Sequence, residues 1–256
     1  MSRWRAPTLL AIPAMAFAIV PIVALALRAP WSHAGSELSR AGTRTALAVS
    51  LEVSIGATAL AVVLAVPVAW ALARIDFPGR ALVRAIVLLP MVLPPVVAGV
   101  ALLTALGRFG VVGRWLAHLG VTLPFTPAGA AVAAAFVAGP FAVLGFEAGF
   151  RSLDERLVEA ARSLGASRWR TFRTVTLPLL RPQVAAGLAL TWARAFGEFG
   201  ATITFAGNLK GSTQTLPLAV FQALQTDPGG AILVSVIMLA LSVLVLAGLA
   251  GRLLQR

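Results

Sequence analysis

Six long apolar runs divide the chain, with shorter polar or basic segments between them. Each run is long enough for an α-helix to cross the hydrocarbon core of a bilayer, which takes about 20 mainly apolar residues. The runs cover residues 7–27, 46–73, 82–106, 127–149, 182–206 and 230–251. The pattern predicts an all-α, polytopic membrane bundle with six transmembrane helices.

The first run raises the question of a signal peptide, because Arg3 and Arg5 precede it. Its apolar stretch is longer than the ~7–15 residues of a signal-peptide core. We therefore expect a retained first span. The whole chain is expected to form one membrane domain over residues 1–256, with the core of the fold at about 46–252.

The composition agrees with a membrane protein. Hydrophobic residues make up 59% of the chain and charged residues 12%, whereas soluble domains have about 45–50% apolar and about 25% charged residues. The sequence has no cysteine, which excludes disulfides, iron–sulfur clusters and thiolate chemistry. The two histidines, His33 and His118, are far apart in predicted loops, so we expect no metal site.

The net charge of +12 fits either nucleic-acid binding or cytoplasmic segments that face anionic lipid. The positions of the basic residues decide between these. With the N-terminus inside, and with Arg84 counted as inner, fourteen of the 21 Lys and Arg residues lie in inner segments and six in outer ones, while Arg194 lies within a run. This follows the positive-inside bias. We predict both termini in the cytoplasm and no nucleic-acid partner.

Prolines interrupt the third run, in the stretch "LLPMVLPPVVAG" that holds Pro90, Pro94 and Pro95. Proline removes a backbone donor and clashes with the preceding helical turn. At membrane depth such a break is tolerated only where protein or water satisfies the freed backbone groups. The run is either a bent helix that lines a pathway or a kinked helix packed against its neighbours.

The inner segment 150–181 is predicted to form a helix, a tight turn and a second short helix. Ser152 and Glu155 have the spacing of a capping box, which predicts the start of the first helix. Gly165 predicts its end, because glycine reaches left-handed dihedrals without steric cost. The first helix would carry one apolar stripe, formed by Leu153, Leu157, Ala161 and Leu164.

The second helix of this segment would be capped by Ser167 and would carry Trp169 and Phe172 as an apolar pair. Leu177-Pro178 is expected to end it before the fifth run. A basic, amphipathic segment with a tryptophan is typical of a helix that rests on lipid headgroups. A docking surface for a cytoplasmic partner is the alternative.

Glu159 to Pro178, "EAARSLGASRWRTFRTVTLP", resembles the EAA loop of ABC importer permeases. That pattern is Glu-Ala-Ala, three residues, Gly, nine residues, an aliphatic residue, one residue and Leu-Pro, and Val175 fills the aliphatic position. In that family the loop is the coupling helix, which seats in a groove of the ATP-hydrolysing subunit. The resemblance implies a coupling role for Glu159, Ala160, Ala161, Gly165, Leu177 and Pro178.

The sequence contains no ATP site of the P-loop type. A P-loop needs Gly-Lys followed by Ser or Thr, and the only lysine, Lys210, follows Leu209. We therefore expect a transport subunit that is not an enzyme and binds no cofactor. ATP and Mg would be bound by a separate ATPase subunit.

The fifth run carries charged residues. Arg194 and Glu198 are four residues apart and so share a helix face, and ionisable residues inside a span normally face a bundle interior or a wet cavity. One interpretation places this pair on the translocation path, with Thr202 and the break at Pro94. The other makes it a self-neutralising pair that fixes helix packing. Gly197 and Gly200 flank Glu198 and permit close helix approach or local unwinding.

Three other polar positions carry expectations. Glu147, near the inner end of the fourth run, is expected to have a structural role, and the role of Glu52 in the second run is left open. Thr215 is expected to cap an outer helix that begins near Pro217, a residue favoured in the first helical turn.

Two stretches, "GEFGATITFAGN" and "TQTLPLAVFQALQT", resemble the molybdate and tungstate branch of ABC importer permeases, and sulfate and thiosulfate permeases share the Glu-Phe-Gly-Ala core. The resemblance implies an oxyanion importer in the cytoplasmic membrane, with molybdate favoured and sulfate, thiosulfate or tungstate as alternatives. It implies a homodimer with two ATP-binding subunits inside and one substrate-binding protein outside. An ion-coupled secondary transporter is the rival class, but the internal repeats of that class are not visible.

Overall fold

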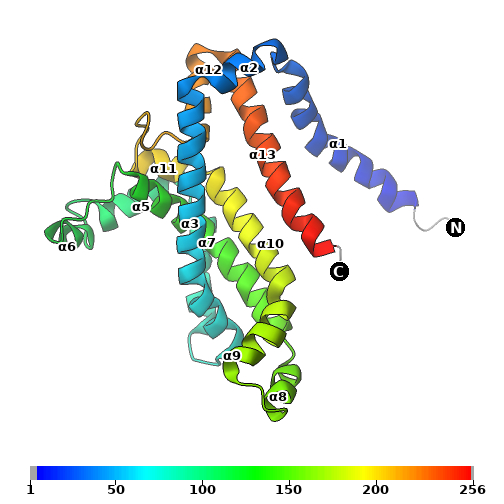
Figure 1. Ribbon diagram of the computed structural model, residues 1–256. Helices are drawn as coiled ribbons and strands as arrows, with labels where there is room; N and C mark the ends of the chain where they lie inside the picture. Colours follow the sequence, from blue (N-terminus) through cyan, green and yellow to red (C-terminus); the bar gives the residue numbers. More distant parts are fainter. Residues whose placement is uncertain (1–4, 255–256) are drawn as a thin grey trace.

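The computed structural model describes residues 5–254, with side chains for residues 12–248. Over this range the chain is all-α, as predicted, and contains no strand (Figure 1). The long helices are α1 (Arg5–Arg28), α3 (Ala41–Arg74), α7 (Pro127–Ser152), α10 (Leu177–Phe196) and α13 (Pro228–Leu254). The shorter α-helices are α2 (Ala34–Ser39), α4 (Arg80–Leu88), α5 (Pro95–Leu106), α6 (Gly113–His118), α8 (Glu155–Ser163), α9 (Arg168–Thr171), α11 (Gly200–Phe205) and α12 (Leu216–Thr226). Two 3₁₀ segments, η1 (Trp31–His33) and η2 (Leu89–Met91), and one π-helical segment, η3 (Phe172–Thr176), complete the set.

The centre of the bundle is formed by α3, α7 and α10 (Figure 1). Alanine recurs every four residues along α3, and these alanines are buried in clusters with residues of α7. They are Ala57, Ala61, Ala65 and Ala69. Residues four apart lie on one helix face, and small side chains let two backbones approach closely. The alanine stripe therefore sets the packing of α3 against α7.

The crossing of α7 with α10 is made by two glycines. A Cβ atom at Gly145 would lie 2.5 Å from the Cα atom of Gly187. Neither position has room for a side chain, so this glycine pair fixes how closely the two helices approach.

Three of the predicted spans are single helices that are long and apolar enough to cross a membrane, namely α3, α7 and α13. Among the described residues, two bent helix pairs raise this number to five if each pair is one span. One pair comprises residues 12–28 and 31–39, and the other comprises residues 80–91 and 95–106. The predicted count of six spans stays a prediction.

The third predicted span is sharply broken. The segment formed by α4 and η2 meets α5 at an angle of 111°. Pro94 and Pro95 stand at the start of α5, and because two successive prolines supply no backbone N–H, the helix must restart there. The break expected from the prolines is confirmed, and the choice between a pathway-lining helix and a packed one stays open.

The fifth predicted span is also broken, so the expectation of one helix over 182–206 is wrong beyond Phe196. The helix α10 ends at Phe196, and residues 197–199 separate it from α11. Local unwinding next to Gly197, one of the two possibilities drawn from the sequence, is therefore present.

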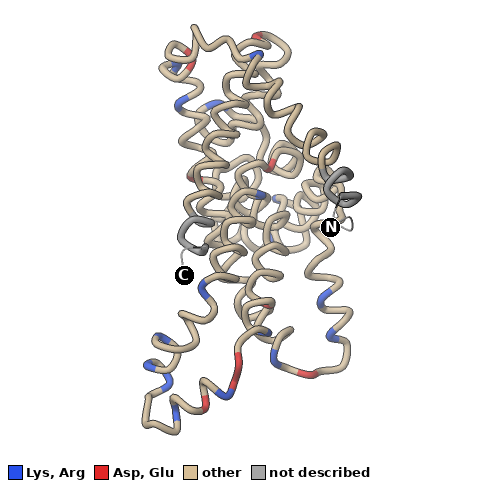
Figure 2. Tube along the Cα trace, turned by 90° about the vertical axis from the view of Figure 1, so that its right-hand side faces the viewer, with Lys and Arg blue, Asp and Glu red and all other residues tan. Residues whose placement is uncertain are grey.

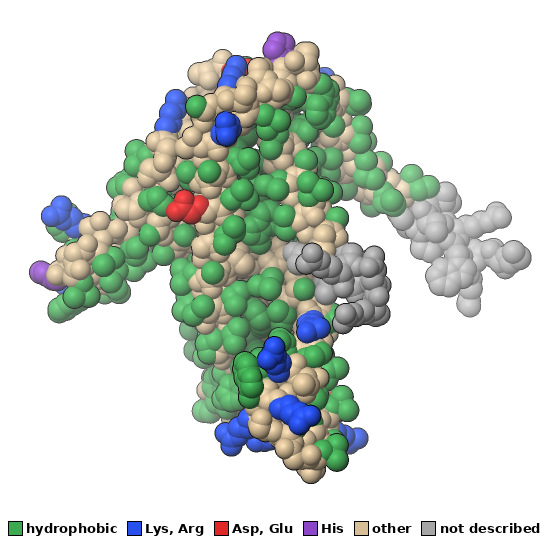
Figure 3. Space-filling view, in the orientation of Figure 1, with side chains coloured by type: hydrophobic (Ala, Val, Ile, Leu, Met, Phe, Trp, Pro, Cys, Tyr) green, Lys and Arg blue, Asp and Glu red, His purple; other side chains and the backbone are tan. Residues whose placement is uncertain are grey.

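The two ends of the bundle differ in their elements. One end carries α8, α9 and the turn between α3 and α4, and we call it the inner end after the predicted topology (Figure 1). The opposite, outer end carries α2 and α12. Charged positions mark both loops of the inner end (Figure 2), and between the two ends the surface is largely apolar (Figure 3). This distribution is typical of a bundle whose middle faces lipid.

Candidate coupling and translocation sites

The inner segment 150–181, called the coupling loop below, begins differently from the sequence prediction. Ser152 is the last residue of α7, and its hydroxyl donates to the carbonyl of Gly149. Asp154 caps α8 instead, because its Oδ1 accepts from the Arg156 N–H at 3.0 Å. The capping box at Ser152 and Glu155 is therefore wrong. An aspartate accepts this bond as readily as a serine, and it stands one residue before the helix.

The turn after α8 agrees with the prediction. Gly165 has a φ of +84°, in the left-handed region that favours glycine. Ser167 caps α9 by accepting from the Arg170 N–H at 3.3 Å. The rings of Trp169 and Phe172 stack with their centroids 5.7 Å apart, which confirms the predicted apolar pair.

The predicted end of the second helix at Leu177-Pro178 is wrong. The backbone runs from α9 through the π-helical η3 directly into α10, whose first turn contains Pro178. Inside a continuous helix a proline removes one backbone hydrogen bond and crowds the preceding turn. The wider π segment changes the hydrogen-bond ladder just before it. The coupling loop is thereby joined to α10 by continuous helix.

Several apolar residues of the coupling loop face outward. The side chain of Leu164 is 89% exposed, that of Trp169 is 67% exposed, and Leu157 is also exposed. Glu159, Ala160 and Gly165 are exposed as well, and Ala161 is half-buried. Leu177 and Pro178 lie half-buried at the base of the loop. Exposed apolar groups gathered at one tip indicate a surface that another body covers.

A buried carboxylate organises the neighbouring part of the inner end. Glu147 of α7 pairs with Arg151, one turn further along the helix, at 2.9 Å, and with Arg84 of α4. A buried carboxylate is stable only when it is paired or hydrogen-bonded. This is the structural role expected for Glu147. Glu52, in contrast, is exposed on α3.

The charged pair of the fifth span is present. Arg194 Nη1 lies 2.7 Å from Glu198 Oε2, and the Glu198 side chain is only 2% exposed. The other oxygen, Oε1, accepts from the Ala201 N–H at 2.8 Å, so the carboxylate also stabilises the start of α11. One side chain therefore holds both sides of the break between α10 and α11.

The breaks of the third and fifth spans meet. A Cβ atom at Gly200 of α11 would lie 2.6 Å from the Cβ atom of Pro95, which directly follows Pro94. Thr202 is buried, and its hydroxyl has no hydrogen-bond partner among the described residues. The structure therefore gathers Glu198, Thr202 and the start of α5 around two adjacent helix interruptions.

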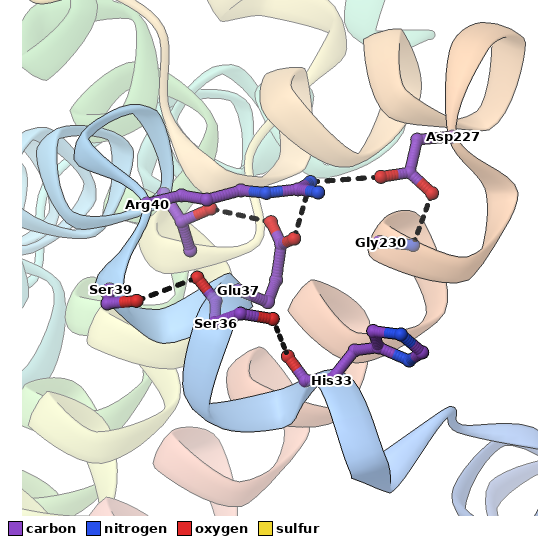
Figure 4. Close-up of polar contacts among 8 residues, drawn as sticks. His33, Ser36, Glu37, Ser39, Arg40, Asp227 and Gly230 are labelled. Atoms are coloured by element: carbon purple, nitrogen blue, oxygen red, sulfur yellow. Dashed lines mark hydrogen bonds and ion pairs between the residues drawn. The ribbon is translucent and has the colours of Figure 1, made fainter.

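The outer end carries a charge cluster that the sequence analysis did not identify. Arg40 Nη1 lies 2.6 Å from Glu37 Oε2 and 2.9 Å from Asp227 Oδ2 (Figure 4). Asp227 also accepts from the Gly230 N–H, and this bond and the Arg40 guanidinium hold the pKa of the Asp227 carboxyl below its ordinary value. The cluster, called the outer clasp below, ties the α2–α3 corner to the α12–α13 corner.

The outer helix α12 starts at the expected place without the expected cap. Thr215 occupies the N-cap position, but its side chain makes no capping hydrogen bond. The Leu216 N–H donates instead to the hydroxyl of Ser50 on α3, at 2.6 Å. Within the part of the chain that the structure describes, no group of three or more His, Asp or Glu residues could hold a metal ion.

The sequence matches known proteins over most of its length. The family described as "Binding-protein-dependent transport system inner membrane component" matches residues 61–256. The molybdenum transport system permease protein ModB of Mycobacterium tuberculosis is 40% identical, over 94% of this chain and 92% of that protein. ModB of Haemophilus influenzae is 46% identical, over 72% of this chain and 81% of that protein. The sulfate transport system permease protein CysT of Escherichia coli is 41% identical, over 70% of this chain and 65% of that protein.

Solved structures share the fold. A bacterial ABC transporter involved in the import of the acidic polysaccharide alginate has a TM-score of 0.70 and 19% identity, and the match covers 96% of this chain and 92% of that one. The MetNI methionine ABC transporter has a TM-score of 0.57 and 18% identity, and the match covers 83% of this chain and 93% of that one.

Proposed function

Because the chain belongs to the family of binding-protein-dependent transport system inner membrane components, we propose that it is the permease subunit of an ABC importer for molybdate. It is a membrane protein that takes part in transport. Two copies would form the translocation unit, with two ATPase subunits at the inner end and a substrate-binding protein at the outer end. No bond of the cargo changes, and ATP with Mg would be bound and hydrolysed only on the ATPase subunits.

The observation that carries this proposal is the exposed tip of the coupling loop. Leu164 and Trp169 present apolar surface at the end of two capped helices. A lipid-resting helix, the alternative drawn from the sequence, would lie in the plane of the headgroups with its apolar face in the bilayer, whereas α8 and α9 extend past the end of the bundle (Figure 1). An apolar surface in that position favours a protein partner.

The coupling residues proposed for this partner are Glu159, Ala160, Ala161 and Gly165, with Leu177 and Pro178 at the base. The continuous helix from α9 into α10 supports a mechanical role, because a displacement of the loop passes directly into α10. Movement of the loop would displace α10, and α10 ends at the break near Glu198.

The translocation path is proposed to pass the two adjacent helix interruptions. Arg194, Glu198, Thr202 and Pro94 are the residues we assign to it. Interrupted helices at membrane depth are tolerated where they line a cavity or are buried in protein. The hydroxyl of Thr202 is buried and has no hydrogen-bond partner within residues 12–248, which supports the assignment, since such a group normally has a water or ligand partner.

Molybdate is favoured over sulfate because, at similar coverage, the ModB relative is more similar: ModB of Haemophilus influenzae is 46% identical over 72% of this chain, whereas CysT of Escherichia coli is 41% identical over 70%. The test is uptake by proteoliposomes that hold the chain with its ATPase and binding protein. We expect ATP-dependent uptake of labelled molybdate that unlabelled molybdate suppresses and sulfate does not. If sulfate suppresses the uptake of labelled molybdate, the assignment of molybdate as the cargo is wrong. Uptake by the chain without an ATPase, driven by a pH gradient, would contradict the ABC function.

A further inference from the structure

Arg74 joins the end of α3 to the coupling loop. Its Nη1 lies 2.6 Å from Oε1 of Glu155, the first residue of α8. Its Nη2 donates to the carbonyl of Leu153 at 3.0 Å. Leu153 is the residue that directly follows α7. One guanidinium group therefore holds both sides of the corner between α7 and α8.

This contact connects two parts of the chain that are distant in sequence. The coupling loop is covalently continuous with α7 at one end and with α10 at the other. The chain leaves α3, in contrast, by the turn that leads to α4. Arg74 supplies a third, non-covalent connection, from the loop to α3.

Apolar packing between α3 and the loop is incomplete beside Arg74. An open pocket of about 390 Å³ is lined there by Trp70, Phe150, Leu153, Phe172 and other residues of α3, α7 and η3. Phe150 packs against the alanines of α3. Beside the pocket, the polar contacts of Arg74 hold the start of α8 against α3. A planar guanidinium that makes two bonds fixes orientation as well as distance.

We propose that Arg74 is a positioning residue that carries the movement of the coupling loop to α3. The inference rests on the proposed function, because it assumes that an ATPase subunit moves the loop. With Arg74 in place, loop movement reaches α3, α7 and α10 together, and these are the three helices at the centre of the bundle. Without it, movement of the loop would reach α3 only through the packing of α3 against α7 and α10.

The contact can be removed without unfolding the protein. The Glu155 side chain is 66% exposed, and exposed ion pairs contribute little to folding stability. The docking surface at Leu164 and Trp169 lies on other residues of the loop. A variant at Arg74 should therefore separate transport from ATPase binding.

The experiment uses the complete complex in proteoliposomes and measures molybdate uptake and ATP hydrolysis in the same vesicles. In Arg74→Gln we expect the ATPase subunit to remain bound and ATP hydrolysis to continue. Molybdate transported per ATP should fall by roughly 2- to 30-fold, the range seen when residues between two sites are changed. Glu155→Gln should act in the same direction and less strongly, because the bond to Leu153 remains.

The matched control is Asp76→Asn. It removes an ion pair with Arg80 at 2.7 Å, on the same inner end, in which the Asp76 side chain is 99% exposed and no residue of the coupling loop takes part. Transport per ATP should stay at the wild-type value. Arg74→Lys, which can keep one of the two bonds, should fall between wild type and Arg74→Gln.

A second measurement tests the connection directly. The chain has no cysteine of its own, so Arg74→Cys/Glu155→Cys places the only two thiols. Joining them with a short bis-methanethiosulfonate linker should raise transport per ATP above that of the unlinked double variant. No rise on linking, or an unchanged ratio in Arg74→Gln, would overturn the inference.

The outcomes for the inference and for the proposed function are distinct. If Arg74→Gln loses its ATPase subunit, Arg74 shapes the docking surface and does not transmit movement, and the inference is overturned while the proposed function stands. If the wild-type chain itself binds no ATPase subunit, the proposed function fails.

Discussion

At the scale of single residues, Gly165 determines whether the coupling loop can turn. Its φ of +84° lies in the left-handed region, and a side chain there would meet open space. The obstacle to substitution is therefore backbone strain alone. For residues other than glycine this conformation costs roughly 1–2 kcal/mol.

Gly165→Val should leave the transmembrane helices inserted and weaken the binding of the ATPase subunit, because the turn between α8 and α9 would change. Co-purification of the ATPase with the permease measures this. Gly79→Val is the matched control, since Gly79 has a φ of +82°, open space around it and a place on the inner end outside the coupling loop. Normal co-purification and transport in Gly165→Val would contradict the coupling role.

Glu198 is the residue where a pathway role and a packing role separate most clearly. Glu198→Ala leaves Arg194 without its partner, and the free energy of unfolding should fall by about 3 kcal/mol, since breaking a buried pair is costly. If Glu198 borders the path, uptake should fall more than ATPase binding does. Equal loss of both would favour the packing interpretation.

The control for Glu198 removes the charge and keeps the shape. Glu198→Gln retains an acceptor for the Ala201 N–H, so α11 should keep its start. The pair Arg194→Met/Glu198→Met removes both charges and should recover stability, measured by thermal unfolding in detergent. Recovery of stability with uptake still low would support the pathway role.

At the scale of elements, a helix or turn was predictable where a single apolar run or a single residue determines it. It was not predictable where it depends on contacts between residues far apart in sequence or on an irregular turn of helix. The spans α3, α7 and α13 follow from long apolar runs, and the turn at Gly165 follows from one residue. The continuous helix through Pro178 was not predictable from the sequence, because it depends on a π-helical segment just before the proline. The charge bridges of Arg74 and of Arg40 with Asp227 join residues far apart in sequence, so no local spacing indicates them.

The α7–α10 crossing supports a prediction about stability. A Cβ atom at Gly145 would contact the backbone of Gly187, which cannot move aside as a flexible side chain would. Gly145→Ala should therefore lower the free energy of unfolding by about 1–3 kcal/mol. Gly139→Ala, on the same helix but with nothing within 4 Å of the new atom, should be neutral. Thermal unfolding in detergent compares the two, and equal behaviour would contradict the close crossing.

The outer clasp supports a prediction about pH. The Gly230 N–H and then the Arg40 guanidinium hold the pKa of Asp227 below its ordinary value of 3.8. A carboxyl with a lowered pKa stabilises the folded state above its ordinary pKa and loses this contribution as the pH falls through the lowered value. The difference in melting temperature between wild type and Asp227→Asn should be constant from about pH 5 to 8 and shrink below pH 3.8. A difference that vanished already near neutral pH would contradict the clasp.

At the scale of the whole molecule, the chain has a helical bundle with a protruding inner tip (Figure 1), and the outer clasp joins two corners at its outer end. The fold class and the place of the coupling loop were predictable from the apolar runs and the basic residues between them. The meeting of the third and fifth spans was not, because it depends on close contact at Gly200 and Pro95, which are far apart in sequence.

The central claim is that a separate ATPase subunit binds the tip of the coupling loop. Because the chain has no cysteine, Leu164→Cys places a single thiol on that tip, and Phe109→Cys, 94% exposed, places one away from it. The measurement is thiol-to-amine crosslinking in inside-out membrane vesicles that contain the ATPase subunit. We predict a permease–ATPase product from Leu164→Cys and none from Phe109→Cys. A Leu164→Cys thiol that reacts only from the outer side, or that crosslinks to no ATPase subunit, would contradict the account.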